Sequence, residues 1–278
     1  MSRRRQHLPW RAAGTASEHQ RTAADVVRER GWVFDSHSSA PSLAAFVASG
    51  DRETEAFIRG FHLDDDPALP LTEQTVVEVG AGIGRMSASL TRSFGRVVAC
   101  DLDPAFLERC RETVAQFGRV DRLQTSQVSD GRTLSLPESS ADMVFSYLTL
   151  QHCHRGDALA LVAESLRVVR PGGRIVLNFR TWLPRDIVLW PLGKLVRATW
   201  HLPRIGQAVA DHRLAARLGW QANRLSPSEV LAIVGSSING VVVYRSPKRR
   251  PFHLPTATEA TFDGVHRAHW WLVAHRVD

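Results

Sequence analysis

The alternation of apolar and polar positions predicts strands and helices in turn between residues 74 and 180. Short runs rich in β-branched and other apolar residues are typical of strands that are buried on both faces of a parallel sheet. Five such runs occur, at residues 75–79, 96–100, 122–128, 141–147 and 173–179. Segments with apolar residues at helical spacing separate most of them, at residues 85–94, 104–117 and 157–170. This order predicts an α/β fold around a largely parallel sheet.

The residues before this core predict three helices. Capping-box spacing at Thr15 and Glu18 starts the first, the second begins near Pro41, and Asp51 caps the third. Residues 1–14 are basic and are predicted to be a flexible N-terminus.

The residues after the core differ in composition from the rest. Residues 180–224 carry four tryptophans and eight arginine or lysine residues against two aspartates. Two helices are predicted there, separated near Pro203. Ser226 starts another helix, and strands at residues 240–244 and 269–275 are predicted to complete the sheet.

Three glycines follow the first strand of the core, at Gly80, Gly82 and Gly84. Glycine is favoured there because the chain must turn sharply and bring its backbone N–H groups close to a ligand, with no Cβ atom in the way. The second strand leads into Asp101, which lies about twenty residues beyond the glycines, the reach at which a carboxylate accepts hydrogen bonds from ribose hydroxyls. The pattern therefore predicts a nucleoside ligand.

The spacing of the loop distinguishes between nucleosides. It reads E-x-G-x-G-x-G from Glu78 to Gly84, whereas nicotinamide-binding loops read G-x-G-x-x-G. A carboxylate at Glu78 disfavours a pyrophosphate and suits a ligand with an ammonium group, such as S-adenosylmethionine (SAM). A later turn, R-V-V-R-P-G-G from Arg167 to Gly173, adds to the pattern. With Asp101, these motifs make the sequence resemble the class I SAM-dependent methyltransferases of small-molecule type.

This resemblance implies a Rossmann-like, doubly wound sheet of seven strands, the last one antiparallel, with SAM as the cofactor. We divide the chain accordingly. Residues 15–73 are expected to form an N-terminal helical lid, residues 74–180 the SAM-binding core, residues 181–224 a helical cap insertion, and residues 225–278 the C-terminal part of the core sheet. Simple packing on the sheet edge is the alternative for the lid, and an ordinary cap or a dimer contact is one interpretation of the insertion.

The resemblance also implies which residues contact SAM. The glycine loop would bend against the methionyl part, Glu78 would favour its ammonium group, and Asp101 would fix the ribose. Leu102 would cover one face of the adenine, and Asp130 would contact the adenine amino group unless it only closes a turn. The predicted cofactor set is Glu78, Gly80, Ala81, Gly82, Gly84, Arg85, Asp101, Leu102, Ser129, Asp130 and Tyr147.

His152 is the candidate catalytic residue. Methyl transfer from a sulfonium is an in-line displacement, for which an enzyme mainly aligns and desolvates the reactants. An alcohol acceptor must also lose its proton, and histidine titrates in the useful range. His152 follows the fourth strand, at the edge where ligands of open α/β sheets bind, in a segment similar to the family's L-Q-H. We predict that His152 is the general base, with a structural histidine as the alternative.

Charge and cysteine content narrow the class of protein further. The net charge of +7 is carried almost wholly by arginine, because only Lys194 and Lys248 are lysines, and this is more typical of genomic base composition than of a nucleic-acid surface. Three cysteines without C-x-x-C spacing, no signal peptide and no long apolar run predict a reduced, cytoplasmic protein. The histidines at 152 and 154 lack a second ligand cluster, so no metal is predicted.

The predicted reaction is O- or N-methylation of a small-molecule acceptor, such as a sugar, a lipid-linked molecule or a secondary metabolite, by a monomer or homodimer. Three alternatives stay open: an RNA or protein methyltransferase, a nicotinamide oxidoreductase, and a non-catalytic SAM-binding module. Against the first, Ser146-Tyr147-Leu148-Thr149 stands where an N/D-P-P-Y type tetrapeptide would follow the fourth strand. The basic, tryptophan-bearing helices of residues 181–224 would also suit a membrane surface or a lipid-linked acceptor.

Overall fold

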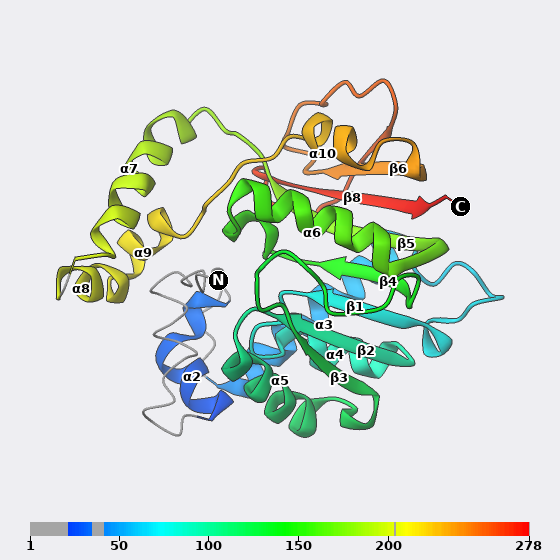
Figure 1. Cartoon of the computed structure of the whole chain (residues 1–278), viewed down its shortest axis with the longest axis horizontal. Helices are drawn as coiled ribbons and strands as arrows, with labels where there is room; N and C mark the ends of the chain where they lie inside the picture. The colour runs from blue at the N-terminus through cyan, green and yellow to red at the C-terminus, as the bar shows by residue number, and fades with distance from the viewer. Residues whose placement is uncertain (1–21, 35–41, 203, 278) are drawn as a thin grey trace.

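The structure is a computed structural model that describes residues 22–34, 42–202 and 204–277. The predictions for the basic N-terminus, for the capping box at Thr15 and for the helix start at Pro41 lie outside these residues. Figure 1 shows one central sheet with helices on both faces, and a group of helices that stands apart from the sheet at the end where α2 also lies.

The sheet has eight strands in the order β3-β2-β1-β4-β5-β8-β6-β7. Neighbouring strands from β3 to β5 are parallel, whereas β8 is antiparallel to both β5 and β6. The chain order reverses between β1 and β4, which makes the sheet doubly wound. The strands are β1 Thr75–Val79, β2 Arg96–Asp101, β3 Leu123–Gln127, β4 Ala141–Ser146, β5 Val169–Arg180, β6 Ile238–Arg245, β7 Thr258–Thr261 and β8 His269–Arg276.

The predicted Rossmann-like α/β fold is confirmed, but the predicted number of seven strands is wrong. The additional strand is β7, which pairs in parallel with β6 at the edge of the sheet. Its sequence, Thr-Glu-Ala-Thr, has no buried residue, so it carries none of the apolar signal from which strands are recognised. Strand β7 joins the edge of the sheet through its backbone pairing with β6.

The sheet is covered by two layers of helices whose apolar sides form separate clusters. Helices α3, α4 and α5 pack on one face, and α6 and α10 on the other. Trp270 and Trp271 are neighbours on β8, are both buried, and belong to the clusters of opposite faces. The helices are α2 Ala23–Arg30, α3 Leu43–Gly60, α4 Arg85–Ser93, α5 Pro104–Phe117, α6 Arg155–Val168, α7 Asp186–Thr199, α8 Ile205–Asp211, α9 Arg213–Gly219 and α10 Pro227–Val234. Short 3-10 turns occupy Gly31–Val33, Leu71–Glu73, Val120–Arg122, Leu150–His152 and Gly235–Ser237.

Helix α3 is continuous where two helices were predicted. The sequence predicts that one helix ends near Ser49 and that Asp51 caps the next, but Ser49, Gly50 and Asp51 all lie inside α3. A Cβ atom on Gly50 would lie 2.3 Å from the carbonyl oxygen of Arg85. Gly50 is therefore a packing glycine that lets α3 approach the start of α4, and it does not end the helix.

Two other helix predictions are corrected. The helix predicted to start at Asp157 begins at Arg155, with His154 as its N-cap, and the buried Asp157 carboxylate accepts a hydrogen bond of 2.5 Å from Arg132. Residues 181–224 form three helices, α7, α8 and α9, where two were expected. The predicted start of α10 is confirmed by a capping box between Ser226 and Glu229.

The N-terminal helices and the cap helices meet. Arg30 of α2 pairs with Asp211 of α8, and the rings of Trp32 and Trp220 lie 5.8 Å apart. One hydrophobic cluster joins α2 and α3 to Ile83 of the glycine loop and to Trp220. Within the described ranges, the structure contains no helix that combines the length and the apolar character needed to span a membrane.

Candidate functional site

The glycine loop between β1 and α4 has the backbone conformation that its sequence predicts. Gly80, Gly82 and Gly84 have φ angles of 85°, 55° and 89°, a region that residues with a side chain rarely adopt. A Cβ atom on Gly80 would lie 2.1 Å from a side-chain carbon of Thr149, and one on Gly84 would lie 3.0 Å from the backbone of Cys110. The loop is therefore held between the end of β4 and helix α5.

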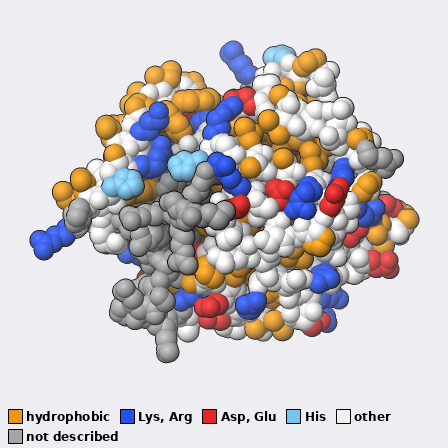
Figure 2. All heavy atoms as spheres, viewed as in Figure 1, with side chains coloured by type: hydrophobic (Ala, Val, Ile, Leu, Met, Phe, Trp, Pro, Cys, Tyr) orange, Lys and Arg blue, Asp and Glu red, His pale blue; other side chains and the backbone are white. Residues whose placement is uncertain are grey.

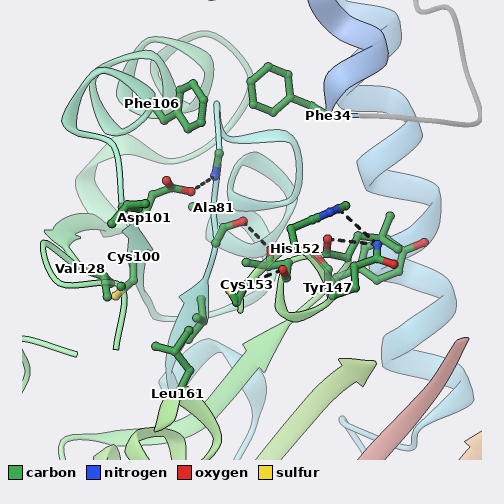
Figure 3. A pocket seen from close by; sticks show the side chains of 18 of the residues that line it. Phe34, Ala81, Cys100, Asp101, Phe106, Val128, Tyr147, His152, Cys153 and Leu161 are labelled. Carbon is green, nitrogen blue, oxygen red and sulfur yellow. Dashed lines mark hydrogen bonds between the residues drawn. The ribbon is translucent and has the colours of Figure 1, made fainter. Parts of the chain in front are cut away.

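Asp101 holds this loop against the end of β2. Its carboxylate accepts hydrogen bonds from the backbone N–H groups of Gly82, at 2.8 Å, and Asp103, at 3.1 Å. Figure 3 shows the first of these bonds crossing from Asp101 to the loop beside Ala81. The acid that was predicted from its distance along the chain is thus in direct contact with the glycine turn.

A cavity of about 860 Å³ opens along the carboxyl ends of β1, β2 and β4. In Figure 3, Asp101 and Val128 line one side of it, and Tyr147 and His152 line the other. Nine of the twelve predicted site residues line this cavity: Glu78, Gly80, Ala81, Gly82, Arg85, Asp101, Leu102, Tyr147 and His152. The fold therefore brings the cofactor candidates and the candidate base to one space.

Three predicted residues, Gly84, Ser129 and Asp130, are not among the residues that line the cavity. Gly84 is the N-cap of α4 and shapes the turn from behind. Asp130 accepts hydrogen bonds from the backbone N–H groups of Arg132 and Thr133, each at 2.8 Å, and from the Thr133 hydroxyl. Its carboxylate closes the turn, which is the alternative that the sequence left open.

Two carboxyl groups beside the glycine loop have raised pKa values. Burial raises the pKa of Glu78 to about 7, although the 2.6 Å hydrogen bond from Ser87 and the charge of Arg85 oppose the shift. Burial also raises the pKa of Asp101 to about 6, against hydrogen bonds from the backbone. Buried carboxylates are stabilised by a nearby cation or by hydrogen-bond donors, so this end of the cavity favours a ligand that supplies both.

Helix α3 reaches the site through Glu53. This carboxylate pairs with Arg85 and accepts a hydrogen bond of 3.0 Å from the hydroxyl of Tyr147. Arg85 also lies 5.8 Å from the centre of the Tyr147 ring. The N-terminal helical region therefore contacts two of the predicted cofactor residues directly, which simple packing on the sheet edge would not require.

His152 is oriented by the end of the cap. Its Nδ1 lies 2.9 Å from the carbonyl oxygen of Trp220, which can only accept, so Nδ1 carries the proton and donates it. The other nitrogen, Nε2, is 3.3 Å from the side-chain nitrogen of Gln151. Burial, together with the nearby guanidinium groups of Arg180 and Arg224, lowers the pKa of His152 to about 4. The imidazole is neutral at physiological pH, and its Nε2 is unprotonated.

Several residues of the site were not found by sequence reasoning. Phe34 lies beside the glycine loop, where a Cβ atom on Gly82 would be 3.3 Å from its ring, and it packs edge-on against Phe106 at 5.2 Å. Thr149, Glu53 and Trp220 contact the site from three distant segments. Phe34 and Trp220 lie within the segments predicted as the lid and the cap, but no spacing rule connects either residue to the loop.

The parallel sheet, the glycine turn and the acids at the ends of β1 and β2 are the features of a Rossmann-like nucleoside site. Residues 77–177 match the family model described as "Methyltransferase domain". In this segment the chain is similar to the class I SAM-dependent methyltransferases.

Curated proteins similar to the chain include methyltransferases with different acceptors. The malonyl-[acyl-carrier protein] O-methyltransferase of Methylococcus capsulatus is 32% identical over 157 residues, which cover 54% of this chain and 52% of that protein. The ubiquinone/menaquinone biosynthesis C-methyltransferase of an Enterobacter species is 29% identical over 162 residues, which cover 56% of this chain and 61% of that protein. The chain thus spans about half to three fifths of the length of these relatives.

Solved structures share the fold at low sequence identity. The magnesium protoporphyrin IX methyltransferase of Synechocystis, solved with bound S-adenosylhomocysteine, has a TM-score of 0.51 and 17% identity, and the match covers 83% of this chain and 85% of that one. A Galdieria sulphuraria protein assigned as a sarcosine dimethylglycine methyltransferase has a TM-score of 0.52 and 15% identity, and the match covers 70% of this chain and 64% of that one. These likenesses concern the fold.

Proposed function

We propose that the chain is an enzyme that uses SAM to methylate an oxygen or nitrogen atom of a small-molecule acceptor. The observation that carries this proposal is the continuity of the cavity. The buried Glu78, the half-buried Asp101 and the glycine loop lie at one side, and His152, Trp220 and Gln221 lie at the other, within one space of about 860 Å³. A donor and an acceptor can therefore be held side by side.

The residues at the loop suit the parts of SAM, which supplies an activated methyl group on a positively charged sulfur. Glu78 would hold the ammonium group, because a buried carboxylate is stabilised by a cation. Asp101 would accept hydrogen bonds from the ribose hydroxyls while its bonds to Gly82 and Asp103 keep it in place. Leu102 would cover the adenine. Water excluded by these apolar and buried groups cannot compete with the acceptor.

His152 would take the proton of an alcohol acceptor at Nε2. Its Nδ1–H bond to the Trp220 carbonyl fixes both the tautomer and the ring orientation. A pKa of about 4 makes the imidazole a weak base, yet it keeps Nε2 unprotonated at every pH above that value. Its contribution to the rate would accordingly lie at the lower end of the range for general bases.

We expect the His152→Ala variant to transfer methyl groups about 100-fold more slowly than the wild type while binding SAM equally well. Because His152 is already neutral, its own titration should not lower the wild-type rate at saturating SAM between pH 8 and pH 5. The measurement is label transfer from SAM as a function of pH, with the exposed His201→Ala as the control. An unchanged rate in His152→Ala would assign the histidine a structural role.

The proposed function is tested by calorimetric titration with SAM, S-adenosylhomocysteine and NADH. We expect SAM and S-adenosylhomocysteine to bind and NADH not to bind. The Asp101→Asn variant should bind SAM about tenfold more weakly or worse, because a neutral amide replaces the carboxylate that would accept hydrogen bonds from the ribose hydroxyls. The wild-type affinity should also decrease as the pH falls through about 6, where Asp101 takes up a proton. Tight NADH binding without SAM binding would instead favour an oxidoreductase.

Label distribution decides the acceptor class. The protein is incubated with methyl-labelled SAM and either an organic-solvent extract of cells, bulk RNA or bulk protein. Label in extractable small molecules supports the proposal, and label only in RNA or protein contradicts it. SAM binding without any transfer would leave a non-catalytic binding module.

A further inference from the structure

The cap helices expose most of the large apolar side chains found on the described surface. Ten such side chains are exposed over the described residues, and eight of them lie between residues 182 and 214. These eight are Trp182, Ile187, Val188, Leu192, Leu195, Leu202, Ile205 and Leu214. Soluble proteins rarely expose so many neighbouring apolar side chains unless that surface is a binding site.

Helix α7 carries the centre of this surface on one side. Ile187, Val188, Leu192 and Leu195 are exposed and fall on one face at helical spacing. Figure 2 shows hydrophobic side chains gathered on the part of the surface where α7 lies in Figure 1, with arginine or lysine side chains beside them. We call this surface, residues 182–214 with their exposed apolar side chains, the cap face.

The opposite side of α7 is firmly attached to the protein. A Cβ atom on Gly193 would lie 2.3 Å from the carbonyl oxygen of Leu218 in α9, so the two helices pack in close contact. Arg197 donates hydrogen bonds to the carbonyl oxygens of Gly219, at 2.8 Å, and Gln221, at 3.1 Å. The helix is therefore held with its apolar side outward, and it does not need to turn that side inward to become stable.

The charges on the cap are arranged with the cations outward. Arg185, Lys194, Arg204 and Arg213 are exposed around the apolar face. Asp186 is fully buried and lies between Arg180 and Arg224. Asp211, the other acid of this segment, pairs with Arg30 of α2. The exposed cap face thus combines apolar side chains with positive charge.

We propose that the cap face docks on an anionic membrane surface. An amphipathic helix that lies in a bilayer interface has Leu and Trp on one side and cations at its edges, which contact the acidic headgroups. Each exposed arginine or lysine near such a surface adds attraction that salt weakens. Trp220 and Gln221, directly after α9, also line the cavity, so docking would bring the site close to the bilayer. The inference goes beyond the proposed function and does not depend on it.

The test is sedimentation of the full chain with phosphatidylcholine vesicles that contain or lack phosphatidylglycerol. We expect binding to the anionic vesicles, weaker binding to the neutral ones, and a loss of binding as salt is raised. The double variant Ile187→Gln/Leu195→Gln should bind anionic vesicles at least about tenfold more weakly than the wild type, because two exposed aliphatic side chains no longer enter the interface. Lys194→Gln should bind about fivefold more weakly.

The matched control is Val120→Gln/Ile233→Gln, which makes the same kind of change at two side chains that are 52% and 48% exposed outside the cap. It should bind vesicles as the wild type does. Circular dichroism and thermal unfolding verify that all variants are folded. No binding of the wild type to anionic vesicles at low salt, or equal binding by the Ile187→Gln/Leu195→Gln variant, would overturn the proposal. A wild-type dimer that this variant dissociates, without vesicle binding, would assign the cap face to a second copy of the chain and equally overturn it.

Discussion

Replacing Gly80 by alanine is expected to weaken SAM binding by about 100-fold or more, because a displacement of about 1 Å in a positioned site is enough for a loss of that size. The new Cβ atom would lie 2.1 to 2.5 Å from the side chain of Thr149, so the loop or the end of β4 must move. The φ angle of 85° adds about 1 kcal/mol or more of backbone strain for a residue with a side chain. Calorimetric titration with SAM measures the loss.

Gly172→Ala is the matched control for backbone strain. Gly172 also has a positive φ, of 73°, but nothing lies within 4 Å of the position that its Cβ would take. We expect this variant to lose about 1 kcal/mol of stability and to bind SAM normally. Adding Thr149→Gly to Gly80→Ala should recover part of the affinity, since the clashing side chain is then absent. Equal SAM affinity in Gly80→Ala and the wild type would show that the loop does not contact the cofactor.

The Glu78→Gln variant is expected to be more stable than the wild type in the absence of ligand. It should bind SAM about 100-fold more weakly, which is the loss expected when one partner of a buried charge pair is removed. The glutamine keeps an acceptor for the Ser87 hydroxyl but removes a charge that is only 4% exposed. Folding raises the pKa of Glu78 from 4.5 to about 7, so the folded state holds more protons than the unfolded state between these values. The wild type therefore loses stability as the pH rises from about 4.5 to 7, by about 3 kcal/mol through this group.

Denaturant unfolding at several pH values between 5 and 8 checks this prediction. The difference in the free energy of unfolding between Glu78→Gln and the wild type should grow with pH and level off above about 7. Glu73→Gln, at an exposed carboxyl group before β1, is the control and should show no such growth. A Glu78→Gln variant that binds SAM as tightly as the wild type would exclude the ammonium contact, whatever its stability.

Local sequence patterns were sufficient to predict the core of the fold and the position of the glycine loop. Short buried strands, the capping box at Ser226 and the glycines after β1 are local features, because backbone hydrogen bonding, burial period and φ preference act over a few residues. Asp101 was found as well, since parallel pairing of β1 and β2 places the ends of both strands at one edge.

The contacts by which distant segments complete the site could not be predicted from the sequence. Glu53 joins Arg85 to Tyr147 across 32 and 94 residues of sequence, and the Trp220 carbonyl orients His152 across 68. No periodicity encodes such contacts, because they depend on how α3 and the cap pack against distant parts of the chain. The same reason explains the outcome at Gly50, a close helix contact that has the same sequence signal as a helix end.

The exposure of the cap face was also decided by packing. The sequence indicated basic, tryptophan-bearing amphipathic helices, but a helix with apolar residues ordinarily buries them. In the folded chain, Gly193 and Arg197 fasten the other side of α7 to α9 and to the residues after it, and this leaves Ile187 and Leu195 in solvent. Which side of a helix faces the protein is set by the shape and hydrogen bonds of its partner, and these lie outside its own sequence.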